Sequence, residues 1–510
     1  MKSLFKTVAY ITIFSVATRA MGFVFRIYLS RTLGAEALGL YQVALSVFSV
    51  LLTVVASGMP VVISKLTAKY YAKKDKNSEG GLVSAALLIS VITSLVLIVL
   101  VLAFKGVFSA LFADDRCYTI LLVLLPAILC SAIYNVFRGA MWGHSNYFPY
   151  CITELFEQTA RIVICVFLLT FGVSSLIPSI SAALSLSIAS LLSAILAVVL
   201  YFVYGGRMKK PNGVYKEVLR SNTSITGVRV ASSLVQPIIA LIVPARLMAA
   251  GYTSAQAMSS YGVAMGMTMP FLFIPITLVS SLSMVLIPDL STALANKDGE
   301  HVNNRIFSSI TFALLITFIL IPLYIGAGEN IGLFFYDNIE SGRLLASAAW
   351  VMLPFALLNI TSAILNALGL EVKSFVNYLF GSIFMFAGII FLPQLIGVRA
   401  IIWAMGLCVS VAALLNIRMI KKCTNVKLNI LKPAIKLSLI SVPTAALTYF
   451  ITSLLSGVIP LFFNLAISCI LGLAMFLSLA VVFGVVNIQM MFVEIKKIIK
   501  IKTKKTKNST

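Results

Sequence analysis

Apolar stretches of about 20 residues, the length of helix that crosses a bilayer, follow one another along almost the whole of this 510-residue chain. The chain is 60% hydrophobic and only 11% charged, too apolar for the surface of a soluble globule. These features predict an all-α integral membrane protein with about 14 transmembrane helices. The predicted spans are residues 8–30, 38–62, 82–104, 119–140, 150–172, 176–204, 223–249, 257–287, 305–328, 345–368, 374–393, 397–417, 434–455 and 460–486.

Positive charge is divided unevenly between the predicted loops. With the N-terminus inside, 29 of the 39 lysines and arginines fall on the inner side and 6 on the outer side, and the other 4 lie within spans. This asymmetry predicts that both termini are cytoplasmic. The net charge of +23 then reflects topology and attraction to anionic lipid headgroups, and it does not indicate nucleic acid binding.

Nothing in the sequence indicates an enzyme, a metal site or a bound cofactor. The two histidines, His144 and His301, fall in short loops, and no Gly-rich phosphate loop or nucleophile elbow is present. The seven cysteines form neither a CxxC pair nor a cluster with histidine, so we expect neither a disulfide framework nor a zinc site. They are Cys117, Cys130, Cys151, Cys165, Cys408, Cys423 and Cys469.

The second half of the chain repeats features of the first at a spacing of about 225 residues, which is typical of transporters built from duplicated units. Examples are GLYQVALSVF (39–48) with SSYGVAMGMT (259–268), and the proline of LLP (126) with that of MLP (354). We therefore predict two six-helix lobes related by a pseudo-two-fold axis along the membrane normal. The predicted parts are an N-lobe (1–204), a cytoplasmic linker (205–222), a C-lobe (223–418), two further spans (419–486) and a basic amphipathic cytoplasmic tail (487–510).

Two arginines lie inside the first predicted span. Arg19 and Arg26 are seven residues apart, so a helix places them on one face, roughly 10 Å apart along its axis. Gly22 lies between them on that face and leaves room for a bulky group. A buried arginine in a membrane is costly unless it faces water, an acid or an anionic ligand. We therefore predict that Arg19, Gly22 and Arg26 belong to a substrate site.

The fifth span carries the sequence TELFEQTAR, which places Glu154, Glu157 and Arg161 on one helix face. Glu157 and Arg161 have the i, i+4 spacing at which a helix pairs opposite charges. Two interpretations remain open. The pair is either a structural ion pair inside the lobe or a proton- or cation-sensitive coupling site.

The seventh span carries Arg229, followed by Gln236 and the helix-breaking Pro237. It opens the second lobe as the first span opens the first lobe, so Arg229 is a further candidate for the same cavity. A cavity lined by arginines favours an anion with several oxygens, such as a diphosphate, because guanidinium groups bind such oxygens in pairs.

The stretches TRAMGFVFRIYLSRTLGAEALGLYQ (18–42), GMPVVISKL (58–66) and ELFEQTARI (154–162) resemble the stage V sporulation protein B-like, polysaccharide-transport-like branch of the multidrug/oligosaccharidyl-lipid/polysaccharide exporter superfamily. The resemblance implies two six-helix lobes around a central cavity and a bacterial cytoplasmic membrane location. It also implies movement of a lipid-linked saccharide to the outer leaflet, as in the related lipid II flippases. In those flippases first-span arginines act on the diphosphate, and Arg19 and Arg26 occupy the matching stretch.

Three functions remain after this reading. The first is a flippase whose partners are a lipid-linked anionic saccharide and the lipid bilayer. The second is cation-coupled efflux of drugs, for which the family typically uses an aspartate in its first span; residues 8–30 contain none. The third is a membrane scaffold that recruits cell-wall synthesis proteins through its basic loops and tail, a role that gives no reason to bury arginines.

Overall fold

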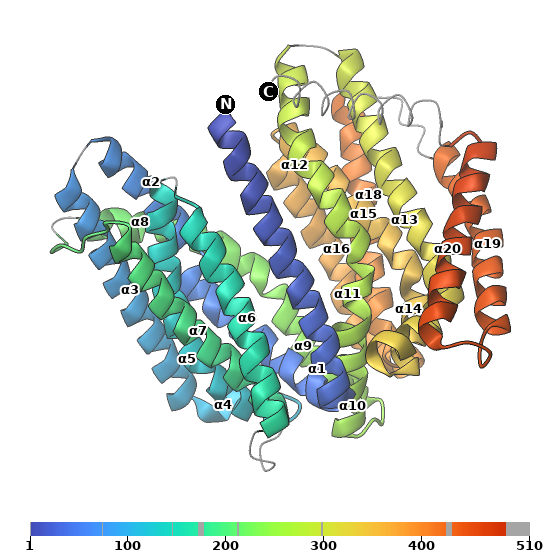
Figure 1. Cartoon of the computed structure of the whole chain (residues 1–510), viewed down its shortest axis with the longest axis horizontal. Coiled ribbons are helices and arrows are strands. Elements are labelled where there is room, and N and C mark those ends of the chain that lie inside the picture. The colour runs from blue at the N-terminus through green and yellow to red at the C-terminus, as the bar shows by residue number, and fades with distance from the viewer. Residues whose placement is uncertain are drawn as a thin grey trace, which may run out of the picture. The chain divides into compact units, whose positions relative to one another are not determined.

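A computed structural model describes residues 2–485 except 74, 145, 172–177, 212–213, 297–298 and 425–430. These residues are arranged in helices and turns, and none of them forms a β-strand, so the predicted all-α class is confirmed. Contacts divide the chain into two compact units, residues 1–267 and 268–510 (Figure 1). The predicted tail, 487–510, lies outside the described residues.

Unit 1, as we call residues 1–267, is a bundle in which α5 occupies a central place and packs against α1, α2, α3 and α7. Ile63, Leu82, Val136 and Phe137 are almost fully buried and belong to one apolar core. The helices are α1 (Lys2–Ala56), α2 (Met59–Ala72), α3 (Lys76–Ala103), α4 (Lys105–Leu111), α5 (Arg116–Gly143), α6 (Phe148–Phe171), α7 (Pro178–Val203), α8 (Tyr215–Ser233), α9 (Val235–Ala249) and α10 (Ser254–Tyr261).

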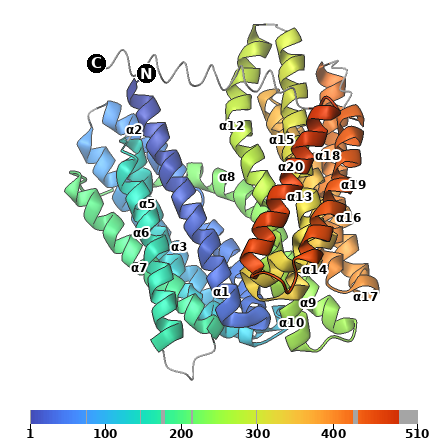
Figure 2. The same cartoon turned by 45° about the vertical axis from the view of Figure 1, so that its right-hand side comes forward.

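Unit 2, residues 268–510, is built around α13, which packs against α12, α14, α15, α19 and α20. Figures 1 and 2 both show α19 and α20 side by side along α13. A π-helix, Gly262–Thr268, joins the two units. The helices of unit 2 are α11 (Met269–Leu272), α12 (Ile274–Ala295), α13 (Gly299–Tyr336), α14 (Ile339–Ala348), a 3₁₀ turn (Ala349–Val351), α15 (Met352–Ala367), α16 (Glu371–Phe391), α17 (Pro393–Ile396), α18 (Arg399–Thr424), α19 (Leu431–Leu454) and α20 (Leu461–Val482).

The predicted number of spans is not confirmed, although each predicted span falls on a helix. By length and composition, ten helical segments of the described residues could cross a membrane, or eleven if one bent pair counts as a span. Three features explain the difference. Predicted span 8–30 and most of span 38–62 lie in α1, which is interrupted at Gly34, and the rest of span 38–62 lies in α2 of the same candidate membrane segment. Helix α6 carries three charged residues, and span 223–249 is split into α8 and α9.

Two local breaks have clear physical causes. Gly34 has φ +73°, a left-handed value that glycine adopts without the steric cost a Cβ brings, and there α1 changes direction. The break between α8 and α9 falls at Leu234, three residues before Pro237. Proline has no backbone N–H to donate, and its ring clashes with the carbonyl four residues earlier. The prediction that Pro237 interrupts this helix is therefore confirmed.

Close backbone contact fixes α10 against α1. A Cβ on Gly39 would collide with the carbonyl oxygen of Met258, and a Cβ on Gly262 would collide with that of Ala35. Small residues allow this approach in membrane bundles, where van der Waals packing holds helices together. The start of predicted span 257–287 is therefore part of unit 1. The division into lobes at residues 204 and 223 stays a prediction.

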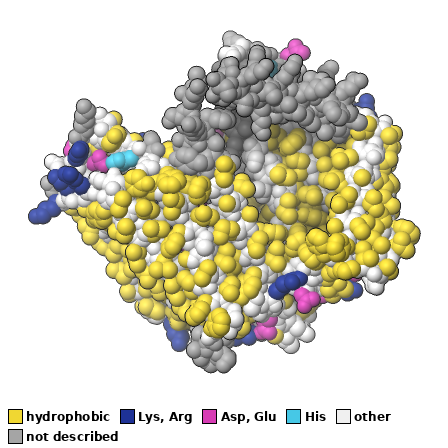
Figure 3. All heavy atoms as spheres, in the orientation of Figure 1, with side chains coloured by type: hydrophobic (Ala, Val, Ile, Leu, Met, Phe, Trp, Pro, Cys, Tyr) yellow, Lys and Arg dark blue, Asp and Glu magenta, His cyan; other side chains and the backbone are white. Residues whose placement is uncertain are grey.

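Hydrophobic side chains cover most of the visible surface of the described residues, and the visible lysines, arginines and acids gather near its borders (Figure 3). Exposed residues of unit 1 include Val99 and Phe171, and those of unit 2 include Val442 and Leu395. A surface of this kind is stable only against lipid, so the chain is a multi-pass membrane protein.

Candidate functional site

The two first-span arginines lie on an uninterrupted stretch of α1, before its break at Gly34. Their seven-residue spacing therefore keeps them on one helix face, as predicted from the sequence. The Arg19 side chain is exposed in unit 1, whereas Arg26 is half-buried. Within the described part of the chain, Arg19 forms no hydrogen bond or ion pair. Its guanidinium is thus open to an anionic ligand.

The space beside Gly22 is partly taken by α6. A Cβ added at Gly22 would lie 3.7 Å from Nε2 of Gln158, so the end of this amide side chain reaches the face that carries the arginines. Arg26 and Arg161 both lie close enough to Tyr41, which is only 5% exposed, for their charges to act on its hydroxyl. The arginine face of α1 and the charged face of α6 are therefore neighbours within unit 1.

Glu157 and Arg161 form the predicted ion pair on α6. The distance from Arg161 Nη2 to Glu157 Oε1 is 2.9 Å, and the two side chains are only 24% and 21% exposed. The hydroxyl of Ser193, on α7, donates to the other carboxylate oxygen over 3.3 Å. The carboxylate of Glu157 thus has one partner on its own helix and one on α7. Whether the pair also couples transport to an ion stays a prediction.

A further cation in unit 1 was not recognised from the sequence. Arg138 is one of the inner-side charges counted from the sequence and falls within predicted span 119–140; it lies in α5, with its guanidinium 4.3 Å from the ring of Trp142 and 4.2 Å from that of Tyr150. Glu154 follows Tyr150 by one turn of α6 and acts electrostatically on it. Cation–π contacts therefore bind α5 to the beginning of α6. The i, i+4 spacing of Arg138 and Trp142 is the signal that could have revealed them.

Arg229 has a partner inside unit 1. Its Nη1 donates to the carbonyl oxygen of Ser57, which directly follows the last residue of α1. Gly58 is packed so closely against α8 that a Cβ there would collide with Asn222 and Thr226. A cation at the C-terminal end of a helix is favourable, because it meets the unpaired carbonyls and the negative end of the dipole. A substrate role for Arg229 stays a prediction beside this structural one.

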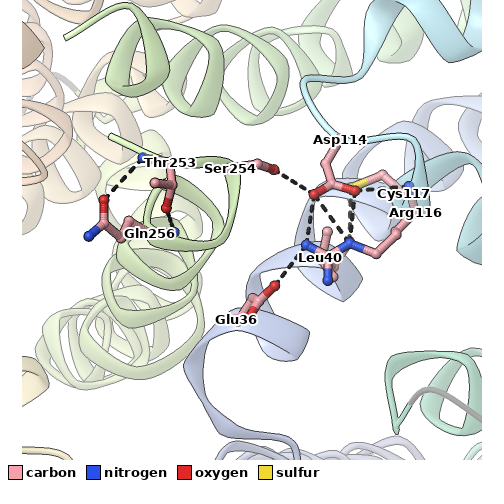
Figure 4. A network of polar contacts seen from close by, with 8 residues as sticks. All are labelled: Glu36, Leu40, Asp114, Arg116, Cys117, Thr253, Ser254 and Gln256. Atoms are coloured by element: carbon pink, nitrogen blue, oxygen red, sulfur yellow. Dashed lines mark hydrogen bonds and ion pairs between the residues drawn. The ribbon is translucent and has the colours of Figure 1, made fainter. Parts of the chain in front are cut away.

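Polar contacts tie three segments together at the end of unit 1 that is predicted to face outward (Figure 4). Arg116, at the start of α5, is bonded to Asp114 over 2.8 Å and to Glu36 of α1 over 2.7 Å. Ser254, at the start of α10, donates to Asp114 over 2.6 Å. The hydrogen bonds from the Arg116 guanidinium, and then those from Ser254, lower the pKa of Asp114 to about 2.

This network predicts a pH-dependent loss of stability. The pKa of Asp114 lies below its ordinary value of 3.8, so its contribution is present above about pH 4 and disappears as the pH falls toward 2. We expect Asp114→Asn to lose about 1–2 kcal/mol of stability at neutral pH and to show a flatter stability profile below about pH 4. Thermal unfolding in detergent across this range measures both effects. An Asp114→Asn variant with the wild-type stability profile would contradict this assignment.

Metal or disulfide chemistry has no visible site in the described part of the chain. No group of three or more histidine, cysteine, aspartate or glutamate side chains is placed to hold a metal ion there. The seven cysteines are free thiols, five of them buried. The expectation that no cofactor is bound therefore stays an expectation.

The sequence matches the family model described as polysaccharide biosynthesis protein over residues 4–294. The chain belongs to this family. Among curated proteins, it is 27% identical to stage V sporulation protein B of Bacillus subtilis (strain 168), over 72% of this chain and 73% of that protein. It is 23% identical to the lipid II flippase MurJ of the same organism, over 73% of this chain and 74% of that protein.

Solved structures show the same fold. The chain resembles a lipid II flippase MurJ in an inward closed conformation with a TM-score of 0.71 at 16% identity, covering 93% of this chain and 98% of that one. It resembles an inward-facing multidrug resistance MATE family transporter with a TM-score of 0.67 at 16% identity, covering 80% and 94% of the two chains. The predicted likeness to stage V sporulation protein B is thus confirmed, and the other relatives named here are a flippase and a transporter.

Proposed function

We propose that this protein is a flippase that moves a lipid-linked saccharide with a diphosphate group across the bacterial cytoplasmic membrane. The observation that carries the proposal is the arginine face of α1, on which Arg19 is exposed and pairs with no carboxylate of the described residues. Charge of this kind inside a membrane helix calls for an anionic partner. The likeness to a lipid II flippase and the membership of a polysaccharide biosynthesis family support a saccharide lipid as that partner.

The proposed mechanism assigns each part of the substrate a different environment. The guanidinium groups of Arg19 and Arg26 bind the diphosphate oxygens, and each planar group can offer two parallel N–H donors. The polyprenyl tail stays in the bilayer, where its burial costs nothing. Alternating access would arise from rocking of the two lobes about the substrate. With both termini in the cytoplasm, substrate would enter from the inner leaflet and leave from the outer one.

The test is translocation in proteoliposomes that contain the purified full-length protein and labelled lipid II. We expect label to become accessible on the opposite leaflet at a rate that depends on the amount of protein, and to exceed the rate in protein-free vesicles. A drug-efflux function would instead show ion flux stimulated by cationic drugs and no movement of lipid II. A scaffold would show neither, which would refute the proposal.

A further inference from the structure

A groove of about 430 Å³ runs between α12 and α15, entirely within unit 2. Its walls are mostly aliphatic and aromatic, but one polar stripe from each helix crosses it. The stripe on α15 consists of Asn359, Ser362 and Asn366, and that on α12 consists of Ser280 and Ser283. Along α15 the spacing of three and then four residues keeps the polar groups on one face over about 10 Å.

None of the residues that line the groove carries a charge. It therefore offers nothing to balance a diphosphate, whose negative charge would be poorly solvated among uncharged side chains. The hydrogen-bonding groups are amides and hydroxyls, each of which can both donate and accept. These are the partners suited to a neutral ligand rich in hydroxyl and amide groups.

The two polar stripes are joined by hydrogen bonds, which leave part of the hydrogen-bonding capacity of Asn359 unused. Asn359 Nδ2 donates to Ser280 Oγ over 3.0 Å, and Ser283 Oγ donates to Asn359 Oδ1 over 3.3 Å. An amide has two N–H donors and an oxygen with two lone pairs, so these bonds leave Asn359 with one donor and one acceptor site. Asn366 is exposed at the same groove and carries its amide toward solvent-accessible space.

Two phenylalanines close one end of the groove. The rings of Phe273 and Phe355 meet edge to face, with centroids 5.4 Å apart, and both side chains are half-buried. The face of an aromatic ring is apolar and carries a partial negative charge, so it packs well against the C–H groups on one face of a sugar ring. The groove thus offers an aromatic face for the C–H groups of a saccharide and neutral amides and hydroxyls for its hydroxyl groups.

We propose that the α12–α15 groove binds the uncharged saccharide portion of the transported lipid. This assignment rests on the proposed flippase function. The polyprenyl tail is a poorer occupant, because it would cover the exposed amide of Asn366 and the half-buried amide of Asn359 without offering either a hydrogen bond. Ordinary interhelical bonding of Asn359 remains the competing explanation of the stripes, and the experiment below separates it from saccharide binding.

The experiment measures binding of two probes, lipid II and a polyprenyl diphosphate without sugar, to the purified full-length protein. Asn359→Leu removes the amide at similar volume, and Asn366→Ala removes an exposed amide that makes no side-chain hydrogen bond to another described residue. Ser281→Ala, on the outer face of α12, where its hydroxyl bonds the carbonyl of Thr277, is the matched control for Ser280→Ala. We expect each groove variant to weaken lipid II binding about three- to tenfold and to leave binding of the sugar-free lipid unchanged. The control should behave as wild type.

Three results overturn the inference, and they are distinct from failure of the proposed function. If the groove variants bind lipid II as tightly as wild type does, or lose both probes equally, the stripes serve only helix packing. If wild type binds the sugar-free lipid but not lipid II, the groove does not accept this glycan. Should wild type bind neither probe, the flippase proposal itself fails. Asn366→Ala keeps the test valid if Asn359→Leu does not fold.

Discussion

Replacing Arg19 and Arg26 together by alanine is expected to lower the rate of lipid II translocation at least about a hundredfold, because hydrogen bonds to charged groups contribute about 1.5–3 kcal/mol each. Both side chains lie on one face of α1, so removing both leaves the diphosphate without its proposed partners on this helix. Translocation in proteoliposomes measures the loss. Arg19 is exposed and bonds no other described residue, so its replacement should not disturb the fold, and thermal unfolding in detergent checks the same for the half-buried Arg26.

The control variants separate charge from geometry. Arg19→Lys with Arg26→Lys keeps the positive charge but loses the forked donor pattern, so we expect about a tenfold loss, between wild type and the alanine variant. Arg31→Ala removes an exposed arginine near the predicted outer end of the same helix and should leave the rate unchanged. An alanine double variant that flips lipid II at the wild-type rate would remove these arginines from the mechanism.

The helical class and the arginine face could be predicted because each depends on local pattern. A run of apolar residues long enough to span a bilayer must form a helix, and a spacing of seven places Arg19 and Arg26 together whatever else the chain does. The i, i+4 spacing of Glu157 and Arg161 likewise determines their pairing within α6. None of these inferences needs a contact with a distant part of the sequence.

What the sequence did not reveal depends on such distant contacts. Arg229 bonds the carbonyl of Ser57, 172 residues away, so its spacing from other charges on its own helix says nothing of its partner. The second aromatic neighbour of Arg138, Tyr150, comes from the next helix, so spacing within α5 does not indicate that contact. The α12–α15 stripes face each other only because two helices about 75 residues apart pack together.

The second large effect is expected at the ion pair of α6. Arg161→Ala leaves Glu157 half-buried with its hydrogen bond from Ser193 but without its cation. Removing one partner of a fully buried ion pair lowers the free energy of unfolding by about 3–5 kcal/mol. Since both side chains here are partly exposed, we expect a loss of about 2–3 kcal/mol. Thermal unfolding in detergent measures it. Ser193→Ala, which removes a hydroxyl shared between Glu157 and the carbonyl of Ser190, should cost about 1 kcal/mol.

The double variant Glu157→Gln with Arg161→Gln decides what the pair is for. Removing both charges leaves no unpaired ion, and glutamine side chains keep similar length and hydrogen-bonding capacity, so stability should return to near the wild-type value. If the pair is purely structural, this variant flips lipid II at the wild-type rate under every ion gradient. If the pair couples transport to protons or cations, the variant folds but no longer responds to the gradient. A double variant less stable than Arg161→Ala would contradict the argument, because the cost could then not come from an uncompensated charge.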